Sequence, residues 1–262
     1  MINRAYRIAQ ILSIDIVIGA VILLRFFCVQ MDVKVGWPVY ILLGITVWLI
    51  YTTDHLNDAE KAKKSVRDRY VFHRNHRKKL LFVAIILLII LFVLVFFIPV
   101  VIMIGGIFLG GFSFLYLIIQ HKLSNFFFKE FYVSMVYTSG ILMVPFSMSG
   151  SIRYEYLILL FLLTFLNLII FSWYEKDADL KDGFKSIATQ SRRSFLERLI
   201  FIVVSFGLGI SILDSNVVAL YFILGFLVYG LMVIYSSWFK KSFRYRFVGD
   251  GVFLMPMLLE WL

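Results

Sequence analysis

The chain has 262 residues, of which 61% are hydrophobic, and this composition excludes an ordinary soluble domain. A soluble fold of this length cannot cover so much apolar side-chain surface. The formal net charge is +10, and the single cysteine, Cys28, excludes an internal disulfide. Several apolar segments exceed the roughly 18 residues that indicate a membrane span. The sequence therefore predicts an integral, multi-pass membrane protein.

Long apolar segments follow one another along the whole chain, and their pattern favours helices. The segment LLFVAIILLIILFVLVFFIPV, for example, lacks the alternation of apolar and polar residues expected in a membrane barrel. The first segment is too long for a signal peptide and has no small-residue cleavage site, so we interpret it as a span. We predict an all-α polytopic bundle of about nine transmembrane helices, with residues 1–262 forming a single domain. The helices are expected near 8–28, 37–57, 79–98, 100–121, 129–148, 155–175, 196–213, 216–238 and 246–262.

The basic residues fall almost entirely on one side of these predicted spans. If the N-terminus is cytoplasmic, then of the 26 Lys and Arg only Arg25, Lys34 and Arg153 face outward. This distribution follows the positive-inside rule, with the charge lying beside anionic lipid. We therefore expect the lipid bilayer, and no nucleic acid, as a partner. We expect a bacterial cell (inner) membrane protein with a cytoplasmic N-terminus.

Two carboxylate pairs end long apolar segments at the cytoplasmic boundary. Asp54 and Asp58 end the second predicted helix, and Glu175 and Asp179 end the sixth. The four-residue spacing puts both carboxylates of a pair on one face of a helix. Acids beside a membrane are costly unless cations neutralise them. Each pair is followed by a long basic loop, near 59–78 and 176–195, which we expect to cap a shared site.

Oxygen ligands from these four acids would suit a hard divalent cation such as Mg²⁺, with room for phosphate oxygens. We therefore interpret Asp54, Asp58, Glu175 and Asp179 as metal ligands. Metal ions bridging a diphosphate would neutralise the charge that develops on it as it departs. Three basic residues close to the acids in sequence are candidates for contacting the outer phosphate oxygens: Arg67, Arg69 and Lys185.

A structural alternative explains the same acids without a ligand. In that interpretation the carboxylates form interfacial salt bridges with neighbouring lysines. The candidate lysines are Lys61, Lys64, Lys176 and Lys181. The recurrence of two similar pairs, each followed by a basic loop, favours the cation and phosphate site.

The arrangement resembles the UbiA superfamily of intramembrane prenyltransferases, in which Asp-rich motifs follow the second and sixth of nine helices. The second family motif is D-x-x-x-D followed by G-x-x-S or G-x-x-T. Here Glu175 and Asp179 stand at the acid positions, followed by Gly183, Lys185 and Ser186. This second motif therefore matches closely.

The first family motif, roughly N-D-x-x-D-x-x-x-D, is degraded in this chain. Asp54 stands at the Asn position, His55 replaces an Asp, Asp58 matches, and Ala62 replaces the last Asp. These departures leave one metal site with fewer acidic ligands than the family motif provides. The segment KEFYVSMVYTSGILMVP also resembles the fifth helix of the family, and we expect its Tyr137, like Asn167 in the sixth predicted helix, to bind substrate.

The resemblance implies transfer of a prenyl group from a polyprenyl diphosphate to an aromatic or other lipophilic acceptor, with Mg²⁺ as cofactor. It places Asp58 and Asp179 among the catalytic residues and, with Glu175, among the metal ligands. The alternative is a catalytically inactive relative, or a transporter, that binds an isoprenoid or a partner without chemistry. The acceptor and the prenyl chain length are left open by the sequence.

Several other polar residues are candidates for lining the same cavity. Asn167 lies eight residues before Glu175, near the same helix face, and either lines a cavity or bonds a neighbouring helix. Asp15 inside the first predicted helix has the same two interpretations, and Asp250 is a candidate extension of the site. His73 is expected in a solvated basic loop rather than at a metal.

Overall fold

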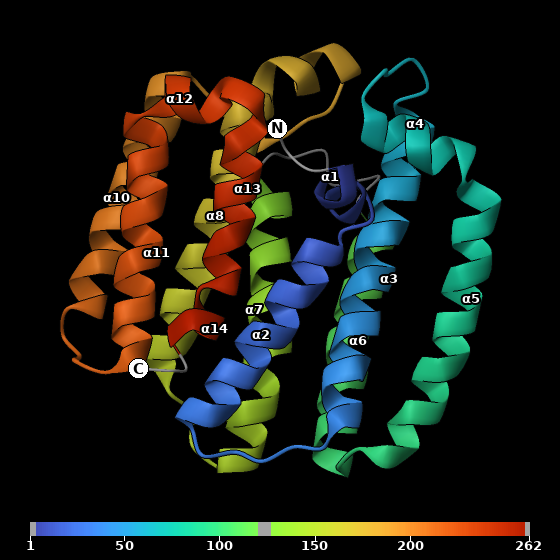
Figure 1. Ribbon diagram of the computed structural model, residues 1–262, viewed down its shortest axis with the longest axis vertical. Coiled ribbons are helices and arrows are strands. Elements are labelled where there is room, and N and C mark those ends of the chain that lie inside the picture. The colour runs from blue at the N-terminus through green and yellow to red at the C-terminus, as the bar shows by residue number, and fades with distance from the viewer. Residues whose placement is uncertain (1–3, 120–126, 260–262) are drawn as a thin grey trace.

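The computed structural model describes residues 4–119 and 127–259, and every regular element in these two ranges is a helix. The long helices run side by side as one bundle (Figure 1). The predicted all-α fold class is therefore confirmed. The elements are α1 (Arg4–Ile11), α2 (Ile14–Gln30), α3 (Trp37–Lys61), α4 (Asp68–Asn75), α5 (Arg77–Leu94), η1 (Val95–Phe97), α6 (Val100–Ile119), α7 (Phe127–Ser149), α8 (Tyr154–Asp182), α9 (Ile187–Gln190), α10 (Arg193–Ser211), α11 (Val217–Ile234), α12 (Ser236–Lys240), η2 (Lys241–Phe243), α13 (Arg244–Gly251), η3 (Val252–Leu254) and α14 (Pro256–Leu259).

Six helices within the described ranges are long and apolar enough to cross a membrane. They lie in α3, α5 with η1, α7, α8, α10 and α11, and α6 adds a shorter apolar stretch, Val100–Leu115. The outward side of α5 and η1 carries large apolar side chains such as Phe82, Phe92 and Phe96, each more than 60% exposed. Such a surface suits lipid rather than water. The expected count of nine spans is not confirmed.

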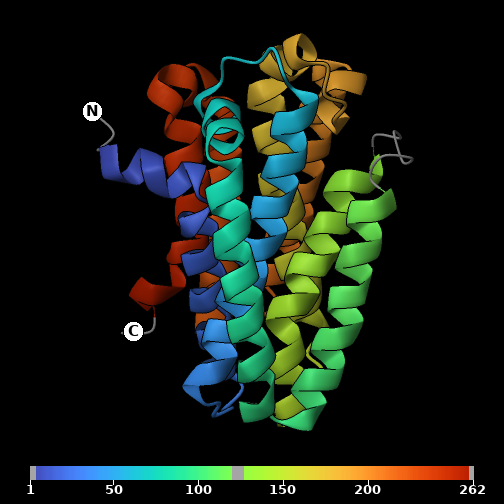
Figure 2. The same cartoon turned by 90° about the vertical axis from the view of Figure 1, so that its right-hand side faces the viewer.

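The first predicted helix, 8–28, is in fact two helices. Ser13 separates α1 from α2 with a φ of 56°, a left-handed conformation that interrupts a helix. Figure 2 shows α1 lying across the bundle axis, whereas α2 runs along this axis. The first α-helical turns therefore lie at one end of the bundle instead of extending the span.

The last predicted helix, 246–262, is also broken. It consists of α13, the 3₁₀ turn η3 and the short α14, which begins at Pro256. Proline has no N–H to donate and therefore cannot continue the hydrogen bonding of the preceding turn. Residues 260–262, like residues 120 and 121 of the fourth predicted helix, lie outside the described ranges.

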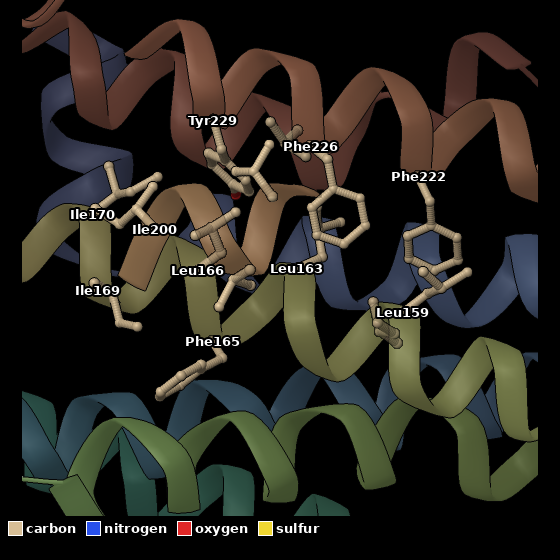
Figure 3. Close-up of a cluster of buried hydrophobic side chains, with 14 of the residues drawn as sticks. Leu159, Leu163, Phe165, Leu166, Ile169, Ile170, Ile200, Phe222, Phe226 and Tyr229 are labelled. Carbon is tan, nitrogen blue, oxygen red and sulfur yellow. The ribbon is translucent and has the colours of Figure 1, made fainter. Parts of the chain in front are cut away.

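The core lies around α8, which packs on two sides (Figure 3). Leu163 on one side faces α11, whose Phe226 and Tyr229 are fully buried, whereas Phe165 points towards α7. Gly207 on α10 allows the Phe226 ring so close that a Cβ at this position would lie 2.3 Å from a ring carbon. This packing on both sides fixes the direction of α8, and with it the position of its last turns.

The predicted capping loops contain helices of their own. The segment 59–78 includes the end of α3, all of α4 and the start of α5, and 176–195 includes α9. Figure 1 shows α1, α4 and α12 gathered at the same end of the bundle. His73 lies within α4 and is 1% exposed. The expectation that it lies in a solvated loop is therefore wrong, because helix formation turns its ring inward.

Candidate functional site

Helix length brings both acid pairs to the same end of the bundle. At 1.5 Å per residue, the 29 residues of α8 span about 43 Å, which exceeds the roughly 30 Å of a hydrocarbon core. Its last turns, with Glu175 and Asp179, therefore project beyond the apolar layer. The 25-residue α3 does the same for Asp54 and Asp58.

A cavity of about 230 Å³ opens between these helix ends. Its walls come from α1, α2, α3, α4, α7, α8 and α13, together with the start of η3 and the connection after α8. The cavity brings together eight of the residues that the sequence predicted for the site. They are Asp54, Asp58, Arg69, Tyr137, Asn167, Glu175, Asp179 and Lys185.

The Gly-x-x-Ser pattern that follows the second acid pair shapes the cavity wall. Gly183, with φ 77°, ends α8 in a left-handed turn in which Phe184 N–H donates to Asp179 O at 2.9 Å. Ser186 then begins α9, because its hydroxyl accepts from Thr189 N–H at 3.2 Å in a capping box. Lys185 lies between the two caps, and the pattern therefore fixes where this cation meets the cavity.

Arg67, from the connection between α3 and α4, bonds three carboxylates of α8. Its Nη1 lies 3.5 Å from Glu175, its Nη2 2.9 Å from Asp179 and its Nε 2.7 Å from Asp182. Partial burial by itself would lower the pKa of Arg67, but the bond to Asp179 and the charges of both Asp residues outweigh it and raise the pKa. The guanidinium is therefore a fixed positive charge beside the second acid pair.

Arg246, on α13, forms the other ion pair of this region, with Glu175 Oε1. The same oxygen accepts from the Tyr245 hydroxyl at 3.2 Å. Within the described residues, the second acid pair is thus neutralised by two arginines, not by the neighbouring lysines considered above. One of those lysines, Lys176, donates instead to the Ser191 carbonyl at 2.8 Å.

The first acid pair is in a different environment. Asp58 is 7% exposed, and no arginine of the described ranges lies within ion-pair distance of it. His55, which stands at a position where the family motif has an acid, is buried with Nε2 3.0 Å from the Ser13 hydroxyl. Ala62, at the other missing acid, is buried in a small apolar cluster with Tyr70. Both departures from the motif therefore have structural roles.

The two acid pairs differ in how well they suit a metal ion. No group of three or more His, Cys, Asp and Glu side chains forms a metal site within the ranges described. Asp54 and Asp58 line the cavity and suit a hydrated Mg²⁺, which proteins commonly bind through one or two carboxylates. Glu175 and Asp179 do not fit a cation as placed, because arginine nitrogens already lie at their oxygens.

Three solved structures have this arrangement of helices, although no family model and no curated protein matches the sequence. The first is the apo structure of a UbiA homologue from Aeropyrum pernix K1, with a TM-score of 0.70 and 11% identity, covering 94% of this chain and 98% of that one. The second is a UbiA homologue from Archaeoglobus fulgidus bound to DMAPP and Mg²⁺, with a TM-score of 0.66, 10% identity and coverage of 96% and 98%.

The third is a digeranylgeranylglyceryl phosphate synthase, with a TM-score of 0.60 and 15% identity, covering 95% of this chain and 93% of that one. All three therefore match nearly the full length of both chains. This chain has the UbiA fold. Sequence identity is so low that the likeness concerns the fold, while the roles of individual residues must be argued from their contacts.

Within this UbiA fold, the sequence interpretation missed Arg246 and Glu130, which both line the cavity. Arg246 lies four residues before Asp250, and this spacing on α13 is the signal that would have pointed to it. Glu130 on α7 is 5% exposed, and its Oε1 accepts from Ile187 N–H at 3.0 Å and from the Ser172 hydroxyl at 3.4 Å. Glu130 therefore fastens the start of α9 to α7 and α8.

The deeper wall of the cavity in this UbiA fold is polar as well. Asp15 and Asp250 both line it. Asn167 lines it and also donates to the Tyr229 hydroxyl at 2.9 Å, so both interpretations of this residue hold.

A second, apolar cavity of about 350 Å³ adjoins the first. Its walls come from α3, α5, η1, α6 and α7, and it includes Gly106, Gly110 and Gly140. Tyr51 and Tyr137 line both cavities. The UbiA fold of this chain therefore places a charged compartment beside an apolar one.

Proposed function

We propose that this chain binds a prenyl diphosphate and transfers the prenyl group to a lipophilic acceptor, with Mg²⁺ as cofactor. The observation that carries the proposal is the convergence of two acid pairs from α3 and α8 on one cavity that adjoins an apolar cavity. A UbiA homologue of the same fold is bound to DMAPP and Mg²⁺. A prenyl diphosphate matches these two compartments, because its charged head suits the first cavity and its apolar tail suits the second.

The head group would lie among the charged residues of the first cavity. Asp58 and Asp54 would hold Mg²⁺, which when bound neutralises charge on the departing diphosphate. Arg69 and Lys185 line the same cavity and would donate to the phosphate oxygens. The protein's own contribution at this end is therefore to bind and orient the head group.

The bond that breaks would lie near aromatic rings. Tyr51, Tyr137 and Phe253 line the cavity, and the rings of Tyr137 and Phe253 lie 5.9 Å apart in an edge-to-face arrangement. An allylic group that loses diphosphate becomes a cation, and aromatic faces stabilise cations by about 0.5–2 kcal/mol each.

A second candidate function is isoprenoid binding without chemistry. The observation that favours it is the neutralisation of Glu175 by Arg246 and of Asp179 by Arg67. The replacement of a motif acid by His55 has the same implication. In this alternative the chain would retain the diphosphate but form no product.

Binding and turnover can be measured separately on the purified protein. We expect retention of dimethylallyl and geranylgeranyl diphosphate that depends on Mg²⁺ and is lost in Asp58→Asn. Asp177→Asn is the matched control, because Asp177 lies in the last turns of α8 at the same end of the bundle but is exposed and 3.8 Å from Lys240, outside the cavity. Mass analysis after incubation with membrane lipid extract then distinguishes a transferase from a binder. Equal retention by Asp58→Asn and the unmodified chain would exclude both.

A further inference from the structure

The second acid pair already has the partners that a metal ion would need to displace. Glu175 Oε1 is bonded by Arg246 and by the Tyr245 hydroxyl, and Oε2 lies 3.5 Å from Arg67 Nη1. Asp179 Oδ1 accepts from Arg67 Nη2 at 2.9 Å. Cations bound in this way neutralise the carboxylates as a divalent metal would, but their positive charge is carried by the protein itself.

The two arginines come from different parts of the fold. The Arg246 guanidinium lies over the Phe171 ring at 5.5 Å, and the neighbouring Tyr245 ring stacks on Tyr174 at 4.5 Å. Arg246 therefore belongs to the packing of α13 on α8. Arg67 comes from a connection between two helices and makes all three of its ion pairs with α8.

Arginine is suited to this position in a way that lysine is not. Its planar guanidinium presents five donors in a fixed fork and stays charged, whereas a lysine is a single mobile point charge. Arg246 lines the cavity, so that its charge also faces whatever anion the cavity holds. Among the residues whose side chains are described, by contrast, no arginine forms an ion pair with Asp58 of the first acid pair.

We infer that Arg246 at Glu175 and Arg67 at Asp179 together take the place of a second divalent cation at this acid pair, so that this chain binds a prenyl diphosphate with one metal ion. The part that concerns the diphosphate rests on the proposed function. The part that concerns the acid pair does not, because the ion pairs exist within the chain alone. Arg67 completes the neutralisation from the side of the α3–α4 connection.

The first experiment uses Mn²⁺ alone, counted by electron paramagnetic resonance on the purified protein without diphosphate. We expect Arg67→Gln combined with Arg246→Gln to bind one more Mn²⁺ than the unmodified chain, and Asp179→Asn in that background to remove the added ion. Arg244→Gln is the matched control, because this arginine is on the same helix but lies over Trp238 at 4.2 Å, outside the cavity. An unchanged count in the double variant overturns the inference.

Loss of folding is separated from loss of binding by thermal unfolding and by a conservative variant. Arg246→Lys keeps a charge at the position, and we expect its Mn²⁺ count to equal that of the unmodified chain. An added Mn²⁺ in Arg246→Lys as well would contradict the replacement of a metal by positive charge.

The second experiment adds dimethylallyl thiodiphosphate, an unreactive analogue of the donor. We expect one Mn²⁺ per bound analogue in the unmodified chain. Two Mn²⁺ per analogue with both arginines present would overturn the inference while supporting the proposed function. Absence of analogue binding would count against the proposed function only, since the Mn²⁺ count without diphosphate decides the inference separately.

Discussion

Arg67 and Asp179 are 112 residues apart in the sequence, and their side chains are joined by a 2.9 Å hydrogen-bonded ion pair. The same two segments meet again where Ser65 Oγ donates to Asp182 Oδ2 at 3.1 Å. The connection after α3 is therefore fastened to the end of α8, and the two halves of the cavity are held as one unit.

Replacing Arg67 by glutamine should destabilise the protein by about 1–3 kcal/mol, because Asp179 and Asp182 would keep their negative charges without the cation between them. Thermal unfolding in detergent measures this effect. Arg77→Gln is the matched control, since its ion pair with Glu60 is about half exposed, and we expect a clearly smaller loss of stability. Equal losses in the two variants would mean that Arg67 does not join the segments.

We expect the free energy of unfolding to decrease as the pH is lowered below 6.5, because of His73. Burial is the main cause that lowers the pKa of this ring below its ordinary 6.5, and the bond from Nδ1 to the Arg69 carbonyl at 2.8 Å offsets only part of it. The unfolded chain therefore takes up the proton first as the pH falls, and the free energy of unfolding decreases below 6.5 and is fully retained above it.

Unfolding free energies of the unmodified chain and of His73→Gln, measured from about pH 7.5 to about pH 5, test this linkage. We expect the variant to have a smaller slope over this range. Parallel pH profiles for the two proteins would show that His73 does not cause the dependence.

The two acids of α3 should differ in their effect on diphosphate binding. Asp58→Asn removes a nearly buried carboxylate with no arginine partner, and we expect affinity to fall by about 10- to 100-fold, as for loss of a contact to a charged group. Asp54→Asn restores the residue of the family motif and should cost less than about threefold. Calorimetric titration with DMAPP and Mg²⁺ measures both; the reverse order of effects would contradict the assignment of Asp58.

Filling the apolar cavity should select against long prenyl chains. A Cβ at Gly140 meets no atom within 4 Å, and this residue lines the cavity, so that Gly140→Leu adds volume where a prenyl tail would lie. We expect weaker binding of geranylgeranyl diphosphate and unchanged binding of DMAPP. Gly209→Leu, also in open space but outside the cavity, is the control. A uniform loss for both ligands would place the tail elsewhere.

The fold class and the convergence of the acids could be predicted from the sequence, because both depend on patterns within single segments of the chain. The apolar runs exceed the span length, and the acid pairs end the two helices that are long enough to project beyond the hydrocarbon layer. The Gly183 and Ser186 signals also correspond to a helix end and a helix start. Each of these features is determined by residues close together in the chain.

The partners of the acids could not be predicted in the same way. Arg67 was interpreted as a phosphate contact because it follows the first motif, and only the path of the α3–α4 connection beside the end of α8 brings it to Asp179. Arg246 lies 71 residues from Glu175, and its spacing from Asp250 indicates a place in the cavity but not the acid that it bonds. The break at Ser13 was missed because a left-handed conformation in a polar residue leaves no mark on the apolar pattern.

Tyr51 and Tyr137 are walls of the charged cavity and of the apolar one. A molecule that fills both compartments would lie beside these two rings. We therefore expect substitution of either tyrosine to alter both head-group discrimination and chain-length preference. At these two positions, the preference for a head group and the preference for a tail length would therefore change together and not separately.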